Sequence, residues 1–461
     1  MPKPIIVAVA ACCVAAAAVS GAQPAPTPLT LPQAVQLSID HYPAVKAAAE
    51  KSAAAAEGVG LARTAYLPRV DLLAQVNRAT HNNVFGLLLP QSVIPSISGP
   101  VLPEHDGASV WGSAVGVLVS WEAFDFGARA AGVAAAEATQ QRAAAASGRA
   151  RLDVSATTAG AFLTLLAAQE VTRAAQAAVD RAKAVEQVAA ALAGADLRPG
   201  LDLERARAES ALSAGQLTEA RRSVAFARAS LAELTGLPLA ALAVEAGPLL
   251  EQAPGVEPAP GQPANHPAVV EQQAAVREAQ SRETALGRSY APRVSLQGAA
   301  FARGTGAETS GATAGGTTGL KPDVSNWGVG LTITFPLLDL PGLRARRHVE
   351  SHREQAEEAQ HALVVQDLAA DLEKAKASLA AARDILSTSA VRLEAARAAN
   401  GQALARYKAG LSTMVEVADA ERLLTQAEAD EALAKLNTWR ARLSWSYATG
   451  DLAAFLQDAG R

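Results

Sequence analysis

The chain repeats itself at long range, and this repeat limits the folds that it can adopt. The segments 42–45 and 66–72 recur as 266–269 and 290–296, each 224 positions later. Further along the shift becomes 214 positions, which relates Asp125 to Asp339, Asp202 to Glu416, and Thr235-Gly236 to Thr449-Gly450. A duplicated unit of this size predicts two structurally equivalent halves and permits pseudo-symmetry in an assembly. The change of register falls between the strand-like motifs, where the second half has the shorter loop.

Alanine dominates the apolar part of the composition. Of the 461 residues, 50% are hydrophobic but only 4% are aromatic. Alanine is the best helix former and adds little volume to a core, so this composition favours long helices packed at close range. The formal net charge of −4 is small and spread along the chain. It argues against a nucleic-acid-binding surface.

Residues 1–22 are expected to be a secretory signal peptide, because a lysine, an apolar stretch and the small residues 20–22 follow one another. Both cysteines, Cys12 and Cys13, fall in this segment. The mature chain would therefore have no thiol for a disulfide or a metal site. An alternative is a lipoprotein signal, since 9–12 resembles a lipobox that would lipidate Cys12. No later run of about 20 apolar residues predicts a transmembrane helix.

The repeat also divides the rest of the chain. Each half is predicted to contain a leading helix, two strands separated by a loop, a very long helix, a turn and a second long helix. A segment rich in Pro, Gly and Gln separates the halves. We therefore expect a first structural repeat at 23–249, a linker at 250–265, a second repeat at 266–450 and a C-terminal tail at 451–461.

The leading helices are expected at 31–62 and 266–288, with Thr30 and Asn265 as caps. The long helices follow Asp125 and Asp339, and about 70 helical residues would span about 100 Å. Leucine repeats every seven residues in the second long helix, which predicts a coiled-coil seam. These leucines are Leu372, Leu379, Leu386 and Leu393, and the small residues Ala375, Ala382 and Ala396 each follow one of them by three positions.

Short strands are predicted where two kinds of residue alternate. In 327–335 the odd positions are large and apolar and the even positions are Gly or Thr, and 113–121 follows a similar pattern. Such alternation gives a strand one apolar face and one small or polar face. The apolar face would suit lipid, with Trp121, Trp327 and Phe335 as an aromatic rim. The alternative is a half-buried strand of a soluble β-sandwich, in which these aromatics belong to a core.

Four strands cannot close a barrel, and an open strand edge cannot face lipid. If these strands enter a membrane, several identical chains must share one barrel, and three chains would supply twelve strands. The long loops between the strands suit the outward loops of such a barrel. The strand count therefore makes a homo-oligomer a condition of function.

Enzyme chemistry has no positive support in the sequence. His348 and His352 lie four positions apart, but a zincin motif needs Glu directly after the first His, and Val349 is there. The Gly-rich stretch 304–319 lacks the ending of a phosphate-binding loop. No serine has the setting of a nucleophile elbow. We therefore expect no catalytic residue, no metal site and no cofactor.

Charged residues gather at the two helical turns. Tyr407, Gly410, Glu416 and Asp419 surround the second turn, and Asp202 holds the matching place at the first. Glu416 and Asp419 are three positions apart and share a helix face. In a symmetric assembly each would form a ring of carboxylates, which repels anions and attracts cations. The alternative is ordinary solvated charge on a helix.

In their order and spacing, these motifs resemble the TolC-like outer membrane efflux protein family over nearly the whole mature chain. The resemblance rests on the duplication, on the paired Tyr-x-Pro-Arg-Val motifs that begin at Tyr66 and Tyr290, and on 121–127 at the first strand-to-helix junction. It also rests on 407–411 leading to 416–420, which matches the second hairpin turn of the family.

The resemblance implies an α+β membrane protein, internally duplicated, that assembles as a homotrimer. Its long antiparallel coiled-coil helices would form an α-barrel through the periplasm. Its four β-strands per chain would contribute to a shared transmembrane β-barrel in the outer membrane of a Gram-negative bacterium. The implied function is a passive exit duct in a tripartite efflux pump or type I secretion system. The implied partners are outer-membrane lipid, a periplasmic adaptor (membrane fusion) protein and an inner-membrane transporter of the RND, ABC or MFS class.

The resemblance also implies roles for the residues at the turns. The constriction acids of the family fall on Glu416 and Asp419, and its gating tyrosine falls on Tyr407, with Asp202 as partner. The sequence departs from the family at Ser412, where some members carry an arginine that helps to lock the closed state. The alternative function is a soluble periplasmic coiled-coil adaptor or scaffold, but the two strand pairs with lipid-like faces argue against it.

Overall fold

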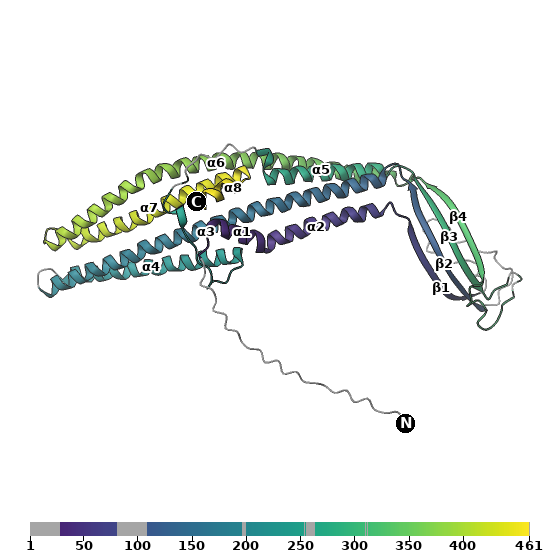
Figure 1. Ribbon diagram of the computed structural model, residues 1–461, viewed down its shortest axis with the longest axis horizontal. Helices are drawn as coiled ribbons and strands as arrows, with labels where there is room; N and C mark the ends of the chain where they lie inside the picture. The colour runs from purple at the N-terminus through teal and green to yellow at the C-terminus, as the bar shows by residue number, and fades with distance from the viewer. Residues whose placement is uncertain are drawn as a thin grey trace, which may run out of the picture.

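The protein is an elongated helical body with a four-stranded β-sheet at one end (Figure 1). The computed structural model describes residues 28–80, 108–195, 200–252, 254, 263–308, 310 and 312–460. The expected fold class is confirmed for the single chain, which combines long antiparallel helices with four strands. In chain order the elements are α1 (Leu31–His41), α2 (Pro43–Thr64), β1 (Arg69–Thr80), β2 (Ser109–Phe124), α3 (Ala128–Gly194), α4 (Gly200–Thr235), η2 (Gly247–Leu249), η3 (Pro263–Asn265), α5 (Pro267–Arg288), β3 (Arg293–Thr305), β4 (Val324–Thr334), α6 (Leu340–Lys408), α7 (Met414–Thr449) and α8 (Ala453–Ala459).

Some sequence predictions lie outside the described residues. These are the signal peptide at 1–22 with Cys12, most of the linker at 250–265, and most of the loop between β1 and β2. Within the described ranges, no helix combines the length and the hydrophobicity that crossing a bilayer requires.

Two helical hairpins form most of the body. α3 has 67 residues and α6 has 69, so each spans about 100 Å at a rise of about 1.5 Å per residue. α4 returns along α3, and α7 returns along α6 (Figure 1). On α6 the predicted seam residues Ala375, Leu379 and Ala382 are buried, and they pack against Ala441 and Trp445 of α7. Small side chains at this seam let the two helices approach closely.

The leading helix of the first half is broken, so the prediction of one helix over 31–62 is wrong. α1 ends before Tyr42, whose backbone is extended (φ −69°, ψ 126°), and α2 begins at Pro43. Proline disfavours the helical conformation of the residue before it, and it fits the first position of a new helix. In the second half the cap of α5 is His266, and not Asn265 as predicted, because the His266 ring accepts a hydrogen bond from the Ala268 amide.

The sheet is antiparallel with the order β1-β2-β3-β4, so each strand pairs with its neighbour in the sequence. β1 begins directly after Pro68, and β3 begins directly after Pro292. The sheet turns away from the long axis of the helices (Figure 1). β1 and β4 are its two edges.

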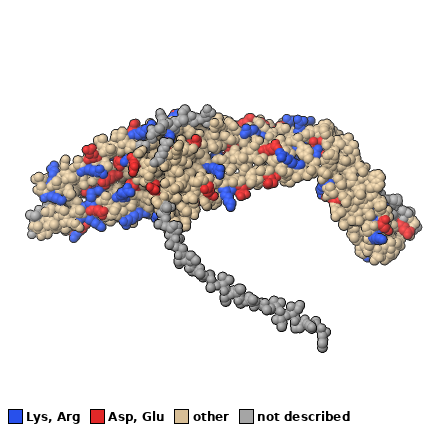
Figure 2. Space-filling model, viewed as in Figure 1, with Lys and Arg blue, Asp and Glu red and all other residues tan. Residues whose placement is uncertain are grey.

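One face of the sheet is apolar from edge to edge. The strand register places Leu72, Val117, Ala300 and Trp327 in one row across it. Trp327 is 82% exposed and Leu331 is 65% exposed, so nothing in the described part of the chain covers this face. The sandwich alternative is therefore wrong for the described residues, which form a single sheet. On the side shown in Figure 2, charged side chains on this limb gather near its ends.

The opposite face carries mostly small and polar side chains, although Leu73, Leu118 and Phe301 also lie on it. Asp71, Gln75 and Asn77 of β1 alternate with the apolar residues, and Gln297 of β3 shares their face. A β-bulge between Glu122 and Phe124 inserts one residue into β2. Because of this extra residue, Phe124 pairs with Val294 and returns to the apolar face.

The largest hydrophobic core lies near the middle of the helical body. Leu31 of α1, Phe162 of α3, Leu231 of α4 and Trp439 of α7 meet there. Phe455 of α8 completes this core and is fully buried. The segment 451–461, expected as a tail, thus contains a packed helix.

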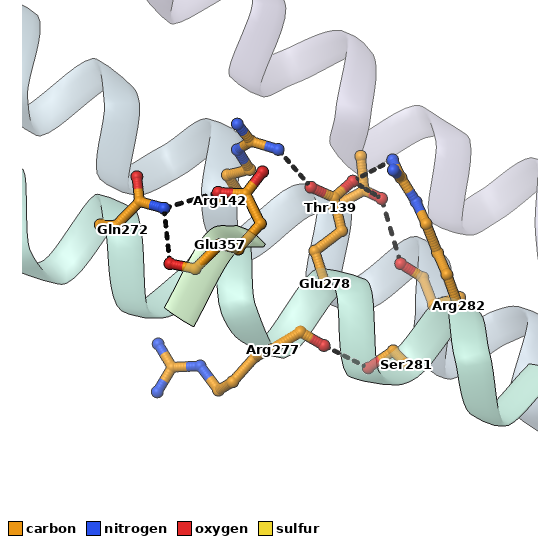
Figure 3. A network of polar contacts seen from close by, with 9 residues as sticks. Thr139, Arg142, Gln272, Arg277, Glu278, Ser281, Arg282 and Glu357 are labelled. Atoms are coloured by element: carbon orange, nitrogen blue, oxygen red, sulfur yellow. Dashed lines mark hydrogen bonds and ion pairs between the residues drawn. The ribbon is translucent and has the colours of Figure 1, made fainter. Parts of the chain in front are cut away.

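A buried carboxylate joins the two halves of the chain between α3 and α5 (Figure 3). Glu278 of α5 is 3% exposed; it accepts hydrogen bonds from Thr139 (2.6 Å) and Arg142 (3.0 Å) of α3 and pairs with Arg282. Burial alone would raise the pKa of Glu278, but these bonds outweigh it and lower the pKa below 4.5. Arg149 of α3 makes a second ion pair with α5. The seam between α3 and α5 is therefore ionic.

Candidate functional site

The second hairpin turn is built by two local motifs. α6 ends at Lys408, and Gly410 adopts a left-handed conformation (φ +81°) that other residues rarely reach. The amide of Leu411 donates to the carbonyl of Arg406, and the amide of Gly410 donates to that of Tyr407. This pattern is a Schellman motif, which satisfies the last carbonyls of a helix. The predicted Gly410 is thus required by the turn itself.

α7 begins with a capping box. The Thr413 hydroxyl accepts from the amide of Glu416 (3.4 Å), and the carboxylate of Glu416 accepts from the amide of Thr413 (3.3 Å). The turn between the two motifs is held by Ser412, which is buried and donates to the carbonyl of Ala403. Glu416 therefore has a structural role in addition to the predicted one.

Tyr407 and Asp202 meet between the hairpins. The hydroxyl of Tyr407 lies 3.5 Å from Oδ2 of Asp202, which belongs to the first turn of α4. Tyr407 is fully buried, and its ring packs with Val185 and Ala206 of the first hairpin and Val417 of α7. This contact joins the two helical hairpins near their turns.

The two predicted constriction acids lie apart from this contact. Glu416 and Asp419 are both exposed on α7. Asp419 has a loose ion pair with Arg422 at 3.6 Å, and the side chains of both are more than half exposed. An exposed pair of this kind adds little stability. The single chain therefore leaves both carboxylates facing solvent.

An ion cluster beyond the turn was not predicted from the sequence. Arg181 of α3 contacts Glu421 (2.8 Å) and Glu428 (3.1 Å) of α7 and donates to Thr425. Asn400 of α6 donates to the other oxygen of Glu421. All three charged side chains are less than a quarter exposed, which strengthens their attraction. The spacing of seven positions between Glu421 and Glu428 indicates that both lie on one face of α7. It does not indicate that Arg181 of α3 is their partner.

A groove of about 500 Å³ separates the two hairpins beside this cluster. Its walls come from α3, α4 and α7 and include Ala178, Glu209, Val417 and Arg422. Arg422 crosses the groove to bind Glu209 of α4 with two hydrogen bonds. Separation of the hairpins would break this contact, the Arg181 cluster and the contact between Tyr407 and Asp202.

The predicted aromatic rim is distributed along the sheet. Trp121 and Phe335 lie at the end next to the helices, and Trp327 lies toward the loop end. The indole N–H of Trp121 donates to the carbonyl of Tyr66 (3.0 Å), and Arg129 stacks over the Tyr66 ring. All three rim side chains are exposed. The indoles of Trp121 and Trp327 combine an apolar ring with a polar N–H, which suits a boundary between lipid and water, and Phe335 adds an apolar ring.

Solved structures of outer-membrane channels share this fold. The Campylobacter jejuni CmeC outer membrane channel is 15% identical, with a TM-score of 0.74 over 91% of this chain and 85% of that one. The open-state MtrE outer membrane channel of Neisseria gonorrhoeae is 21% identical, with a TM-score of 0.72 over 92% and 89%. The Vibrio cholerae outer membrane protein VceC is 17% identical, with a TM-score of 0.72 over 91% and 96%. The architecture is thus that of an outer-membrane channel protein.

The sequence itself matches the outer membrane efflux protein family over residues 34–237 and 263–451. The chain belongs to that family, whose members are passive channels and not enzymes. Among characterised relatives, protein CyaE of Bordetella pertussis is 31% identical over 227 residues. The aligned region covers 49% of this chain and 43% of CyaE. This chain therefore matches less than half of the length of that relative.

Proposed function

We propose that this protein is the exit duct of a tripartite efflux pump or type I secretion system, located in the outer membrane of a Gram-negative bacterium and extending into the periplasm. The observation that carries the proposal is the sheet, whose exposed apolar face is rimmed by Trp121, Trp327 and Phe335. A water-facing sheet would not expose such a continuous apolar surface. Family membership and the shared channel fold support the same function.

The duct is a homotrimer in this proposal. The sheet has two unpaired edges, β1 and β4, which lipid cannot satisfy. Three chains supply twelve strands and close the sheet, with the small and polar face toward the lumen. The helical hairpins of the three chains then continue the tunnel below the membrane. The repeats at 23–249 and 266–450, flanking the linker at 250–265, make this trimer nearly sixfold, and α8 of the segment 451–461 packs into the central core of each chain.

The narrow end of the tunnel is gated by the residues around the turns. Tyr407 and Asp202 hold the hairpins together in the closed state, and Gly410 forms the turn that positions α7. Glu416 and Asp419 from three chains form an acidic ring that favours cations. The exposure of both carboxylates in the single chain supports this role, because nothing neutralises them fully.

The duct itself supplies no energy. An inner-membrane transporter of the RND, ABC or MFS class provides the substrate and the driving force, and a periplasmic adaptor protein joins the two. The signal peptide at 1–22 directs the chain across the inner membrane. The adaptor alternative is disfavoured because an adaptor has no use for an exposed apolar sheet.

Membrane fractionation tests the proposal. We expect the full-length protein, expressed in a Gram-negative host, in the outer-membrane fraction as a trimer that resists mild detergent and dissociates on heating. Reconstituted into planar bilayers, it should conduct ions. Recovery as a periplasmic monomer without bilayer activity would contradict the proposal and favour the adaptor.

A further inference from the structure

A cavity of about 490 Å³ lies where the second pair of strands meets its helices. Its walls come from the segment after α5, from β3, from the end of β4 and from the first turns of α6. Arg293 of β3 and Arg346 of α6 line it, together with Asp339. Leu338 and Leu343 supply an apolar wall. The cavity thus combines two guanidinium groups with an aliphatic surface.

The cavity lies on the polar face of the sheet. Arg293 faces Thr334 across the ladder of β3 and β4, and both residues line the cavity. Gln297, four positions along β3 from Arg293, is on the same face, because side chains alternate along a strand. In the trimer of the proposed function this face borders the lumen. The cavity would then open onto the path of the exported molecules.

The charge of the cavity is positive. In the part of the chain that the structure describes, neither Arg293 nor Arg346 forms an ion pair, and both are exposed. Asp339 is the single acid among the described lining residues. Glu122, which faces Ser295 on the same side of the sheet, does not line the cavity. Two positive charges against one negative charge favour an anion.

The matching place in the first half of the chain is filled. The shift of 214 positions relates Leu343 to Arg129 and likewise relates the two aspartates. Arg129 binds Asp125 at 2.8 Å, and its guanidinium lies 4.8 Å from the centre of the Tyr66 ring. A leucine makes neither contact. Leu343 therefore leaves Asp339 without an arginine partner and leaves the space open.

The charges beside the cavity differ between the halves in the same way. The counterpart of the β3 arginine is Arg69, which pairs with Asp71 at 2.9 Å. Ser295 stands in place of this aspartate in the second half, so the arginine there has no such partner. Arg346 has Gly132 as its counterpart. Because the first half folds with the place filled and the charges paired, the duplicated fold does not require an open basic cavity.

We propose that this cavity binds an amphiphilic organic anion. A carboxylate, sulfonate or phosphate group lies between Arg293 and Arg346, since guanidinium groups bind such oxyanions with charge-assisted hydrogen bonds. The apolar part of the ligand covers Leu338 and Leu343. Leu338 is 95% exposed, so this contact removes apolar area from water. The inference rests on the proposed function, because it names a class of molecule that the duct binds during export.

Isothermal titration calorimetry of the full-length protein in a non-ionic detergent tests the site, with 1-naphthalenesulfonate as the probe. Titration into detergent alone gives the background. We expect R293Q/R346Q to bind the probe about 30-fold more weakly than the wild type, because it loses two charge-assisted hydrogen bonds. The matched variant R69Q, at the equivalent place in the first half, should bind it as the wild type does. Equal affinity in R293Q/R346Q and the wild type would overturn the proposal.

L343R is a second test, which keeps both arginines of the site. It reproduces the arrangement of Arg129, so the introduced side chain should pair with Asp339 and fill the cavity. We expect no probe binding and a midpoint of thermal unfolding no lower than that of the wild type. Probe binding by L343R at the affinity of the wild type would overturn the assignment to this cavity.

Other probes separate the parts of the proposal. Benzyltrimethylammonium, an aromatic cation, should not bind, and binding equal to that of the sulfonate would overturn the role of charge. Inorganic phosphate should bind more weakly than the sulfonate, and equal binding would overturn the role of the apolar wall. A protein that conducts ions in planar bilayers but binds no naphthalenesulfonate would reject the site and leave the duct intact. A protein without conductance would contradict the proposed function itself.

Discussion

The hydroxyl of Tyr407 lies 3.5 Å from Oδ2 of Asp202 and connects the end of α6 to the start of α4. The two residues are 205 positions apart in the sequence. Both are buried, so the contact is shielded from water. Arg181 and Arg422 make further polar contacts between the hairpins on the same side of the central core.

Tyr407→Phe should favour the open tunnel. The substitution removes one hydrogen bond and keeps the buried ring, at a cost of about 1 kcal/mol to the closed state. The open fraction should then rise about fivefold. Single-channel recording in planar bilayers measures it. If the two residues act through each other, Tyr407→Phe combined with Asp202→Ala should open the channel no more than Asp202→Ala alone. Additive effects would contradict a direct contact.

Removing the Arg181 guanidinium should destabilise the contact between the hairpins more than Tyr407→Phe does. Arg181→Met leaves Glu421 and Glu428 without their counter-charge, although water reaches both in part. We expect a loss of about 2 kcal/mol, less than the 3–5 kcal/mol of a fully buried pair. Thermal unfolding in detergent measures the loss. Adding Glu421→Gln and Glu428→Gln should restore most of it.

Arg222→Met is the control for Arg181. Arg222 pairs with Glu219 on its own helix, and both side chains are more than half exposed. Its removal should leave the midpoint of thermal unfolding nearly unchanged. Equal losses in the two variants would show that the Arg181 cluster is no stronger than a surface pair.

Neutralising the proposed acidic ring should reduce cation selectivity. Glu416→Gln preserves the capping box, because glutamine at this position can also accept from the Thr413 amide. The double variant with Asp419→Asn should therefore fold normally and shift the reversal potential toward anions in a salt gradient. Glu219→Gln, on an exposed part of α4, should leave it unchanged. An unchanged reversal potential in the double variant would remove Glu416 and Asp419 from the aperture.

His266 should make the folded protein sensitive to mild acid. Its Nδ1 accepts from the Ala268 amide and its Nε2 donates to the carbonyl of Tyr447, so the folded state needs the neutral ring. Burial lowers the pKa of His266 below 6.5 in the fold, despite the nearby carboxylate of Asp153. Its contribution to stability is complete above pH 6.5 and decreases as the pH falls below that value.

The midpoint of thermal unfolding at pH 7.5 and pH 5.5 measures this effect. His266→Asn keeps a helix cap and removes the titrating ring, so the difference between the two pH values should shrink. Tyr447 does not titrate in this range, because burial and its bond to Asp153 raise its pKa to about 12. An equal pH dependence in the wild type and His266→Asn would assign the effect to other groups.

Much of this architecture follows from local patterns in the sequence. The alternation of 327–335 predicted the strand and its apolar face, and the heptad leucines predicted the seam of α6. The duplication predicted two equivalent halves, which the matching strand registers reproduce. Such patterns work because they depend on residues that are close in the sequence.

The failures have three physical causes. The break at Tyr42 was missed because the helical periodicity of 31–62 outweighed the effect of Pro43 on the residue before it. His266 was missed as a cap because histidine rarely takes that role. The Arg181 cluster was missed because it joins three helices, and only tertiary packing brings their side chains together. The gating and constriction roles were inferred from a family resemblance and stay predictions. They concern Tyr407, Asp202, Glu416 and Asp419.

α8 has a consequence for the biosynthesis of the protein. Phe455 enters the same core as Leu31, so the central core cannot close without α8. A chain that stops before residue 453 would expose Trp439 and Leu452 to the periplasm. Because exposed core residues attract proteases, unfinished chains would be degraded before they could join an assembly. The stability of the central core thus depends on contacts between residues more than 400 positions apart in the sequence.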